Sequence, residues 1–122
     1  MTSESPYVLI AEDEFLIRMS VVEDMRDADF HVFEASNAVE ALALLEAHPE
    51  IDTLFTDIDM PGSMDGLALA KAVRELRPDV MILLTSGYLR VALNDLPDQF
   101  PFFSKPYEIG RVINHIRGHL TQ

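Results

Sequence analysis

The residues of this chain that could do chemistry follow short, largely apolar runs, at the points where strands would end. Four runs lead into such residues: residues 8–11 into Glu12 and Asp13, 53–56 into Asp57, 81–85 into Ser86, and 102–104 into Lys105. In an open parallel α/β sheet, ligands bind outside the carboxyl ends of the strands. We therefore expect these carboxylates, the hydroxyl and the ammonium to share one crevice. Such a set suits a hard divalent cation, a phosphoryl group and a nucleophilic aspartate.

The elements that would position these residues alternate between strand and helix along the chain. The run at 8–11 is apolar throughout and the run at 81–85 is apolar up to Thr85, which is typical of parallel strands covered on both faces. Between the strands, apolar residues recur at helical spacing. The expected apolar faces are Phe15, Leu16, Met19, Val22 and Met25; Leu67, Ala70, Val73 and Leu76; and Ile109, Val112, Ile113, Ile116 and Leu120. The pattern predicts a doubly wound (βα)5 sandwich with a parallel sheet.

Two helix starts carry capping signals. Asn37 followed by Glu40 resembles a capping arrangement for a helix that runs to about Ala47. Before the first helix, Asp13 or Glu14 could serve as the N-cap, besides any metal-binding role. Residues 88–99 carry only a weak helical pattern.

Length, charge and composition limit the function. The 122 residues are expected to form one domain, 1–122, and the formal net charge is −12. An acidic surface repels phosphate backbones, so we expect no nucleic-acid partner. The chain has no cysteine and no apolar stretch near the ~18 residues of a membrane span, so we expect a cytoplasmic protein with no membrane contact.

The residues resemble the receiver domain of two-component response regulators, in its CheY-like form. The matching elements are Glu12-Asp13, the segment 57–66, Ser86-Gly87 and Lys105-Pro106. The resemblance covers essentially the whole chain. It implies a five-stranded parallel sheet in the flavodoxin-like order 2-1-3-4-5. The short spacing from Ser86 to Lys105 implies a shortened fourth helix.

The resemblance also implies roles for the site residues. Asp57 would be the phosphoacceptor, and Lys105 would pair first with Asp57 and then with the phosphoryl group. Mg²⁺ would be bound directly by Asp13 and Asp57, through water by Glu12, and by the backbone carbonyl of Asp59. Ser86 would donate a hydrogen bond to a phosphoryl oxygen.

Several features depart from the common form of the family. The acidic pair begins with glutamate, and the loop after Asp57 is one residue longer. Thr85 stays open as the hydroxyl ligand, although the glycine after Ser86 favours Ser86. Phe102 occupies the position of the family's switch aromatic. An inward and outward swing of the Phe102 ring is a hypothesis, and the simpler alternative is that Phe102 belongs to a core strand.

The expected function is that of a single-domain receiver in a phosphorelay, a signalling domain rather than a turnover enzyme. It would take a phosphoryl group from a phosphohistidine on a sensor histidine kinase or a histidine phosphotransfer protein. It would then contact an unidentified downstream protein or act as a phosphate sink. Two alternatives are a phosphohydrolase resembling the haloacid-dehalogenase group and a degenerate receiver that only binds a partner. The order of the motifs disfavours the first, because the acids precede the nucleophile. The presence of all four chemical groups (the acidic pair, Asp57, Ser86 and Lys105) disfavours the degenerate receiver.

Overall fold

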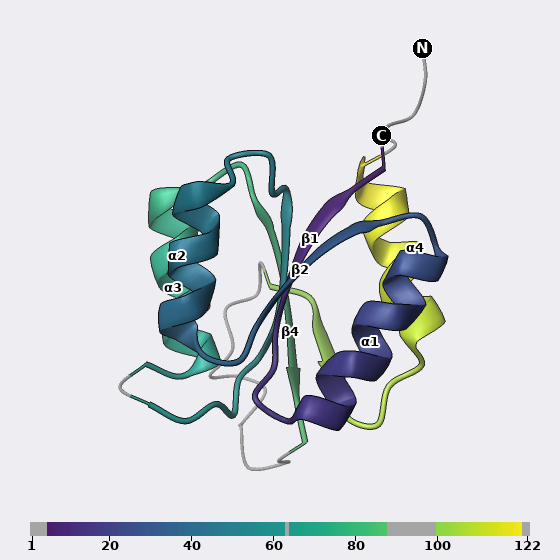
Figure 1. Cartoon of the computed structure of the whole chain (residues 1–122), viewed down its shortest axis with the longest axis horizontal. Coiled ribbons are helices and arrows are strands. Elements are labelled where there is room, and N and C mark those ends of the chain that lie inside the picture. The colour runs from purple at the N-terminus through teal and green to yellow at the C-terminus, as the bar shows by residue number, and fades with distance from the viewer. Residues whose placement is uncertain (1–4, 63, 88–99, 121–122) are drawn as a thin grey trace.

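The computed structural model describes residues 5–62, 64–87 and 100–120, which form a sheet between two layers of helices (Figure 1). The elements are β1 (Tyr7–Ala11), α1 (Phe15–Asp27), β2 (His31–Ala35), α2 (Ala38–Ala47), β3 (Thr53–Asp57), α3 (Gly66–Leu76), β4 (Met81–Ser86), β5 (Phe102–Ser104) and α4 (Ile109–Leu120). The five strands pair in parallel in the order β2-β1-β3-β4-β5. This confirms the predicted α/β fold and strand order. The shortened fourth helix, expected within 88–99, lies outside the described residues.

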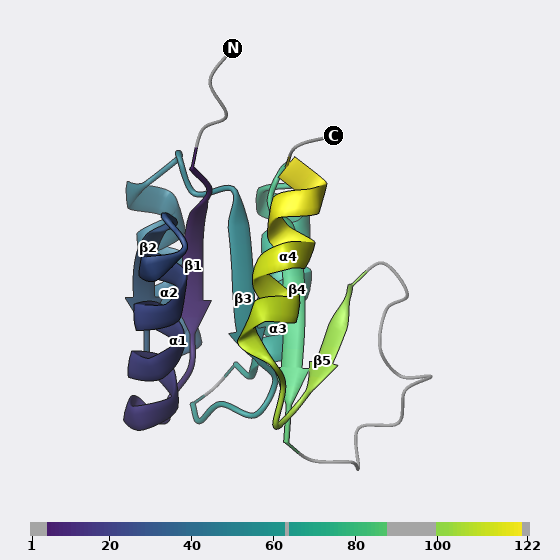
Figure 2. The same ribbon diagram turned by 90° about the vertical axis from the view of Figure 1, so that its right-hand side faces the viewer.

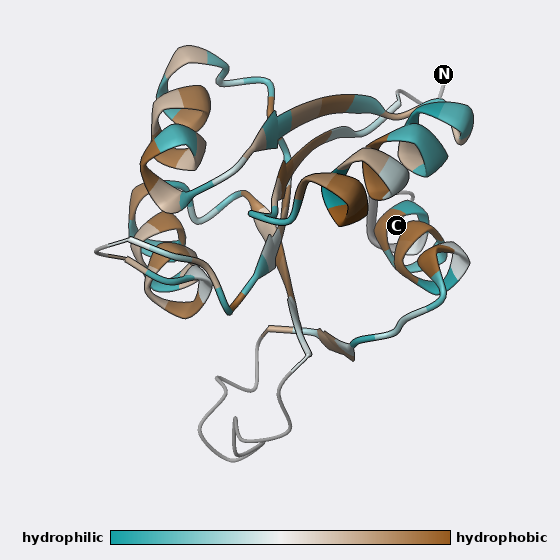
Figure 3. Cartoon of the chain, turned by 60° about the horizontal axis from the view of Figure 1, so that its bottom comes forward, coloured by the Kyte–Doolittle hydropathy of each residue, from teal (hydrophilic) through white to brown (hydrophobic). Residues whose placement is uncertain are grey.

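Helices cover both faces of the sheet, with α2 and α3 on one side and α1 and α4 on the other (Figures 1 and 2). On the α2–α3 side, Leu54 and Leu84 of the strands pack with Val73 of α3. On the other side, Phe55 of β3 packs with Ile116 of α4. β3 and β4 are buried along their whole length, as expected for strands covered on both faces, and brown stretches mark the central strands in Figure 3. The edge strand β2 differs, because His31 and Glu34 are exposed.

The helix α1 buries only part of the apolar stripe that its sequence pattern predicts. Val22 and Met25 are buried as expected, together with Val21, whereas Leu16 and Met19 are 75% and 51% exposed. Two stripes of apolar residues share the helical period on α1. Periodicity locates the helix but does not say which stripe faces the sheet. The expectation for α3 fails at one position in the same way, because Leu76 at its end is exposed.

Local hydrogen bonds shape the starts of α1 and α2. Asn37 accepts from the Glu40 N–H at 2.8 Å and Glu40 reaches back to the Ser36 N–H at 2.7 Å, which confirms the predicted capping arrangement. Glu14 stands at the N-cap of α1, but its side chain makes no capping hydrogen bond. Its backbone N–H instead donates to Glu12 Oε2 at 3.1 Å. The acidic pair is thus part of the turn that leads from β1 into α1.

Within the described part of the chain, no helix has both the length and the apolar character needed to cross a bilayer.

Candidate functional site

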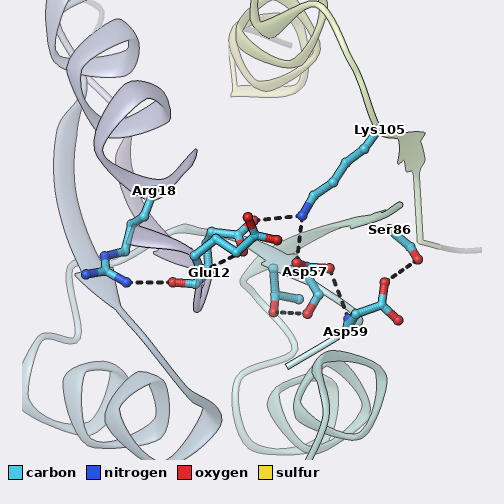
Figure 4. A network of polar contacts seen from close by, with 8 residues as sticks. Glu12, Arg18, Asp57, Asp59, Ser86 and Lys105 are labelled. Atoms are coloured by element: carbon cyan, nitrogen blue, oxygen red, sulfur yellow. Dashed lines mark hydrogen bonds and ion pairs between the residues drawn. The ribbon is translucent and has the colours of Figure 1, made fainter. Parts of the chain in front are cut away.

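The carboxyl ends of β1, β3, β4 and β5 lie at one edge of the sheet. In the strand register Ala11 pairs with Thr56, Asp57 pairs with Thr85, and Ser86 pairs with Ser104. The residues at or after these strand ends therefore face a common space (Figure 4). The structure brings together the predicted site residues on β1, β3, β4 and β5, and their roles stay predictions.

Lys105 connects the two buried acids of the site. Its Nζ donates to Asp57 Oδ2 at 2.8 Å and to Glu12 Oε1 at 3.0 Å. The Lys105 side chain is 17% exposed, and the Glu12 and Asp57 side chains are only 4% and 3% exposed. The ammonium therefore offsets the repulsion between two carboxylates that have little access to water.

Burial changes the protonation of this cluster. It raises the pKa of Glu12 to about 7, although hydrogen bonds from Glu14 and Lys105 act in the opposite direction. Burial alone would lower the pKa of Lys105, but its hydrogen bonds to Asp57 and Glu12 raise the pKa overall. Lys105 therefore stays charged at neutral pH.

A group of three carboxylates that could hold a cation lies beside this lysine. One carboxylate oxygen from each of Glu12, Asp13 and Asp57 lies within 4.8 Å of the others. Asp13 is partly exposed, so the cluster opens to solvent on its side, while the other two acids are buried. Hard oxygen donors with room for water suit Mg²⁺, which keeps several of its waters in protein sites. The chemistry of this donor set fits the expected metal.

Asp59 contacts both Asp57 and Ser86. Its backbone N–H donates to Asp57 Oδ1 at 3.0 Å, and its side chain accepts from Ser86 Oγ at 2.5 Å (Figure 4). The sequence predicts a role for the Asp59 backbone carbonyl and gives no sign of this side-chain contact.

Thr85 and Phe102 occupy different surroundings from Ser86. The Thr85 hydroxyl is buried and has no hydrogen-bond partner among the described residues. Phe102 is half-buried on β5 and packs against the core cluster that includes Leu84. In this structure Phe102 is therefore a packed strand residue, and its swing stays a hypothesis.

Two further residues shape the site, and the sequence analysis assigns a role to neither of them. Arg18 on α1 donates to the backbone carbonyl of Glu12 at 2.8 Å and to Glu34 Oε1 at 3.0 Å. At Gly66, a Cβ atom would lie 1.7 Å from the backbone oxygen of Asp57. The sequence signal for Arg18 is a basic residue four positions after an N-cap, and the signal for Gly66 is a glycine at the start of a helix. Both signals are common in other proteins.

A groove of about 640 Å³ begins beside Lys105, between α1 and the connection from β5 to α4. Its lining includes the apolar side chains of Leu16 and Ile109 and the ring of Tyr107. Burial raises the pKa of Tyr107 to about 12, so its hydroxyl stays protonated. The groove could thus receive a partly apolar surface next to the lysine.

Comparison with known proteins gives consistent results. The model of the response regulator receiver domain family matches residues 8–117. The response regulator receiver protein CpdR of Brucella abortus is 36% identical over 112 residues, covering 89% of this chain and 92% of CpdR. The sensor kinase CckA of the same organism is 34% identical over 124 residues, covering 98% of this chain and 13% of CckA. A solved response regulator receiver protein from Sinorhizobium medicae superposes with a TM-score of 0.84 at 28% identity, covering 98% of each chain.

Proposed function

Because the chain belongs to the response regulator receiver family, we propose that Asp57 is its phosphoacceptor and that residues 1–122 act as one receiver domain. A domain of this family is a signalling component of a phosphorelay rather than a turnover enzyme. The observation that carries the assignment is the contact of Lys105 with Asp57 at 2.8 Å, beside the carboxylates of Glu12 and Asp13. The proposed nucleophile Asp57 thus lies beside both the ammonium of Lys105 and the carboxylates proposed to bind Mg²⁺.

In the proposed transfer, a carboxylate oxygen of Asp57 attacks the phosphorus of a phosphohistidine. A P–O bond forms, the P–N bond breaks, and its electron pair stays on the imidazole nitrogen, which takes up a proton from solvent. Lys105 is close enough to Asp57 to contact the phosphoryl oxygens after transfer and to stabilise their negative charge. Positioning and charge neutralisation are the main requirements of phosphoryl transfer.

Mg²⁺ would be held directly by Asp13 and Asp57, through water by Glu12, and by the Asp59 backbone carbonyl. When bound, it would neutralise charge on the phosphoryl oxygens. The close approach of the three carboxylates supports this set, since without a cation they repel one another.

The donor is proposed to be a sensor histidine kinase or a histidine phosphotransfer protein. The groove beside Lys105 is a suitable place for it, because the exposed Leu16 offers apolar contact there. The output is proposed to be contact with a downstream protein or removal of phosphoryl groups from the relay.

Uptake of one phosphoryl group from acetyl phosphate with Mg²⁺, measured by intact mass, tests the assignment. We expect the wild type to gain the mass of one phosphoryl group and Asp57→Ala to gain none. Asp27→Ala is a matched control, because Asp27 is an exposed acid at the far end of α1 and should leave uptake unchanged. No uptake by the wild type would favour a degenerate receiver, and continuous release of phosphate from small phosphoesters would favour a phosphohydrolase.

A further inference from the structure

The Asp59 side chain accepts the hydrogen bond of the Ser86 hydroxyl, the group that the proposed reaction needs. Ser86 is 2% exposed, and its Oγ donates to Asp59 Oδ2 at 2.5 Å, a short distance typical of a hydroxyl bound to a carboxylate. In Figure 4, Asp59 lies between Asp57 and Ser86 and contacts both. The backbone N–H of Asp59 donates to Asp57 Oδ1 at 3.0 Å.

A serine hydroxyl has one proton to donate. In the described structure that proton is directed to Asp59. In the proposed phosphorylated state, Ser86 donates to a phosphoryl oxygen on Asp57. The two hydrogen bonds compete for the same proton, so the first must break before the second can form.

We infer that the Asp59 carboxylate is a positioning residue, which holds the Ser86 hydroxyl until Asp57 carries a phosphoryl group and thereby weakens the phosphorylated state. This inference rests on the proposed function. On phosphorylation the Ser86 O–H transfers its hydrogen bond to a phosphoryl oxygen. The half-buried Asp59 carboxylate then takes water in its place.

A second effect of Asp59 must be separated from the first. Its negative charge lies next to the position of the incoming phosphoryl group and would repel it even if Ser86 were absent. Competition for the hydroxyl depends on Ser86, whereas repulsion does not. A double-mutant cycle over the two residues distinguishes these effects.

The test measures the equilibrium affinity for beryllium fluoride, which binds carboxylates as a phosphoryl mimic, at saturating Mg²⁺. Wild type, Asp59→Ala, Ser86→Ala and the double variant are compared by calorimetry. We expect Asp59→Ala to bind roughly tenfold more tightly than wild type, the effect of releasing a charge-assisted hydrogen bond. In the Ser86→Ala background, the same change should give a clearly smaller gain.

Asp59→Asn is the second variant, because it keeps the shape and an acceptor oxygen while removing the charge. It should give an intermediate gain that also shrinks in the Ser86→Ala background. Mg²⁺ affinity without beryllium fluoride is measured for every variant, so that a change at the metal site is subtracted.

If Asp59→Ala tightens beryllium fluoride binding equally in the wild-type and Ser86→Ala proteins, the inference is overturned, and charge repulsion by Asp59 explains the whole effect. Weaker binding by Asp59→Ala would also overturn it, since Asp59 would then support the phosphoryl group. If the wild type neither binds beryllium fluoride nor takes up a phosphoryl group, the proposed function fails and the inference falls with it. If the wild type binds beryllium fluoride normally and Asp59→Ala gives the same gain with and without Ser86, the inference fails and the proposed function stands.

Discussion

Arg18 fixes the backbone of Glu12: its Nη1 donates to the Glu12 carbonyl oxygen at 2.8 Å. The Glu12 N–H in turn donates to the carbonyl of Ala35 on β2 at 3.0 Å. Both sides of this residue are therefore held before its side chain meets Lys105. Glu12 is therefore positioned by α1 and β2 as well as by its own strand.

We expect Arg18→Met to weaken Mg²⁺ binding about tenfold, as loss of a residue that orients metal ligands commonly does. Glu34→Gln is the matched control, because it removes the acid that pairs with Arg18 while the bond to the Glu12 carbonyl stays possible. The partly exposed pair itself should contribute less than about 1 kcal/mol. Titration calorimetry with Mg²⁺ measures both variants, and equal affinities for Arg18→Met and wild type would contradict this role.

Binding of Mg²⁺ should stabilise the folded state. At a free concentration ten times the dissociation constant, the free energy of unfolding should rise by ~1.4 kcal/mol. Thermal unfolding with Mg²⁺ and with a chelator measures the gain. Asp13→Asn should lose most of it, and the exposed Asp27→Asn should keep it. A melting temperature that does not respond to Mg²⁺ would argue against the metal site.

Removal of the Lys105 charge should destabilise the metal-free protein. Lys105→Met leaves the buried carboxylates of Glu12 and Asp57 without their cation, which we expect to cost about 3 kcal/mol of unfolding free energy. Adding Glu12→Gln to this variant should recover part of the loss, because it removes a buried acid that, without the ammonium, must either stay charged or take up a proton. Denaturant unfolding in a chelator measures all three proteins. No recovery in the double variant would show that packing of the lysine stem, and not its charge, is responsible.

The fold follows from the sequence more directly than the contacts of the site do. Strands buried on both faces are continuous apolar runs, and their parallel pairing places Asp57 and Lys105 at one edge. The bond from Arg18 to Glu12 is different, because it depends on the direction of a long side chain across a turn. The contact between Ser86 and Asp59 likewise depends on the path of the loop after β3. Neither residue type nor spacing carries that information.

The close approach of Gly66 to the end of β3 gives a sharp test of the backbone around Asp57. In Gly66→Ala, the new Cβ would lie 1.7 Å from the Asp57 oxygen and 2.8 Å from the Ile58 Cα, both backbone atoms. The backbone must move, so we expect a loss of about 4 kcal/mol or more. Gly110→Ala is the control: its Cβ meets nothing within 4 Å, and a helical alanine should add ~0.5–1 kcal/mol. Wild-type stability in Gly66→Ala, measured by denaturant unfolding, would contradict the close approach.

Glu40 should contribute stability that depends on pH. Its hydrogen bonds from the Ser36 N–H and hydroxyl lower the pKa of Glu40 below the ordinary 4.5. A lowered folded-state pKa means that the contribution is present above 4.5 and is lost as the pH falls through the folded value. Because Glu40 is exposed, we expect Glu40→Gln to lose only about 0.5 kcal/mol at neutral pH. The difference from wild type, followed by denaturant unfolding, should shrink below pH 4. A difference that is constant with pH would exclude the ionised carboxylate as its source.

The hydrogen bonds of Lys105 join positions far apart in the chain: Glu12 is 93 residues away and Asp57 is 48 residues away. Closing the loops between such distant positions costs chain entropy. Lys105 follows β5, a strand of only three residues that pairs with β4. The lysine reaches both carboxylates only when this short strand is docked, so the charge balance of the whole edge depends on the pairing of β5 with β4.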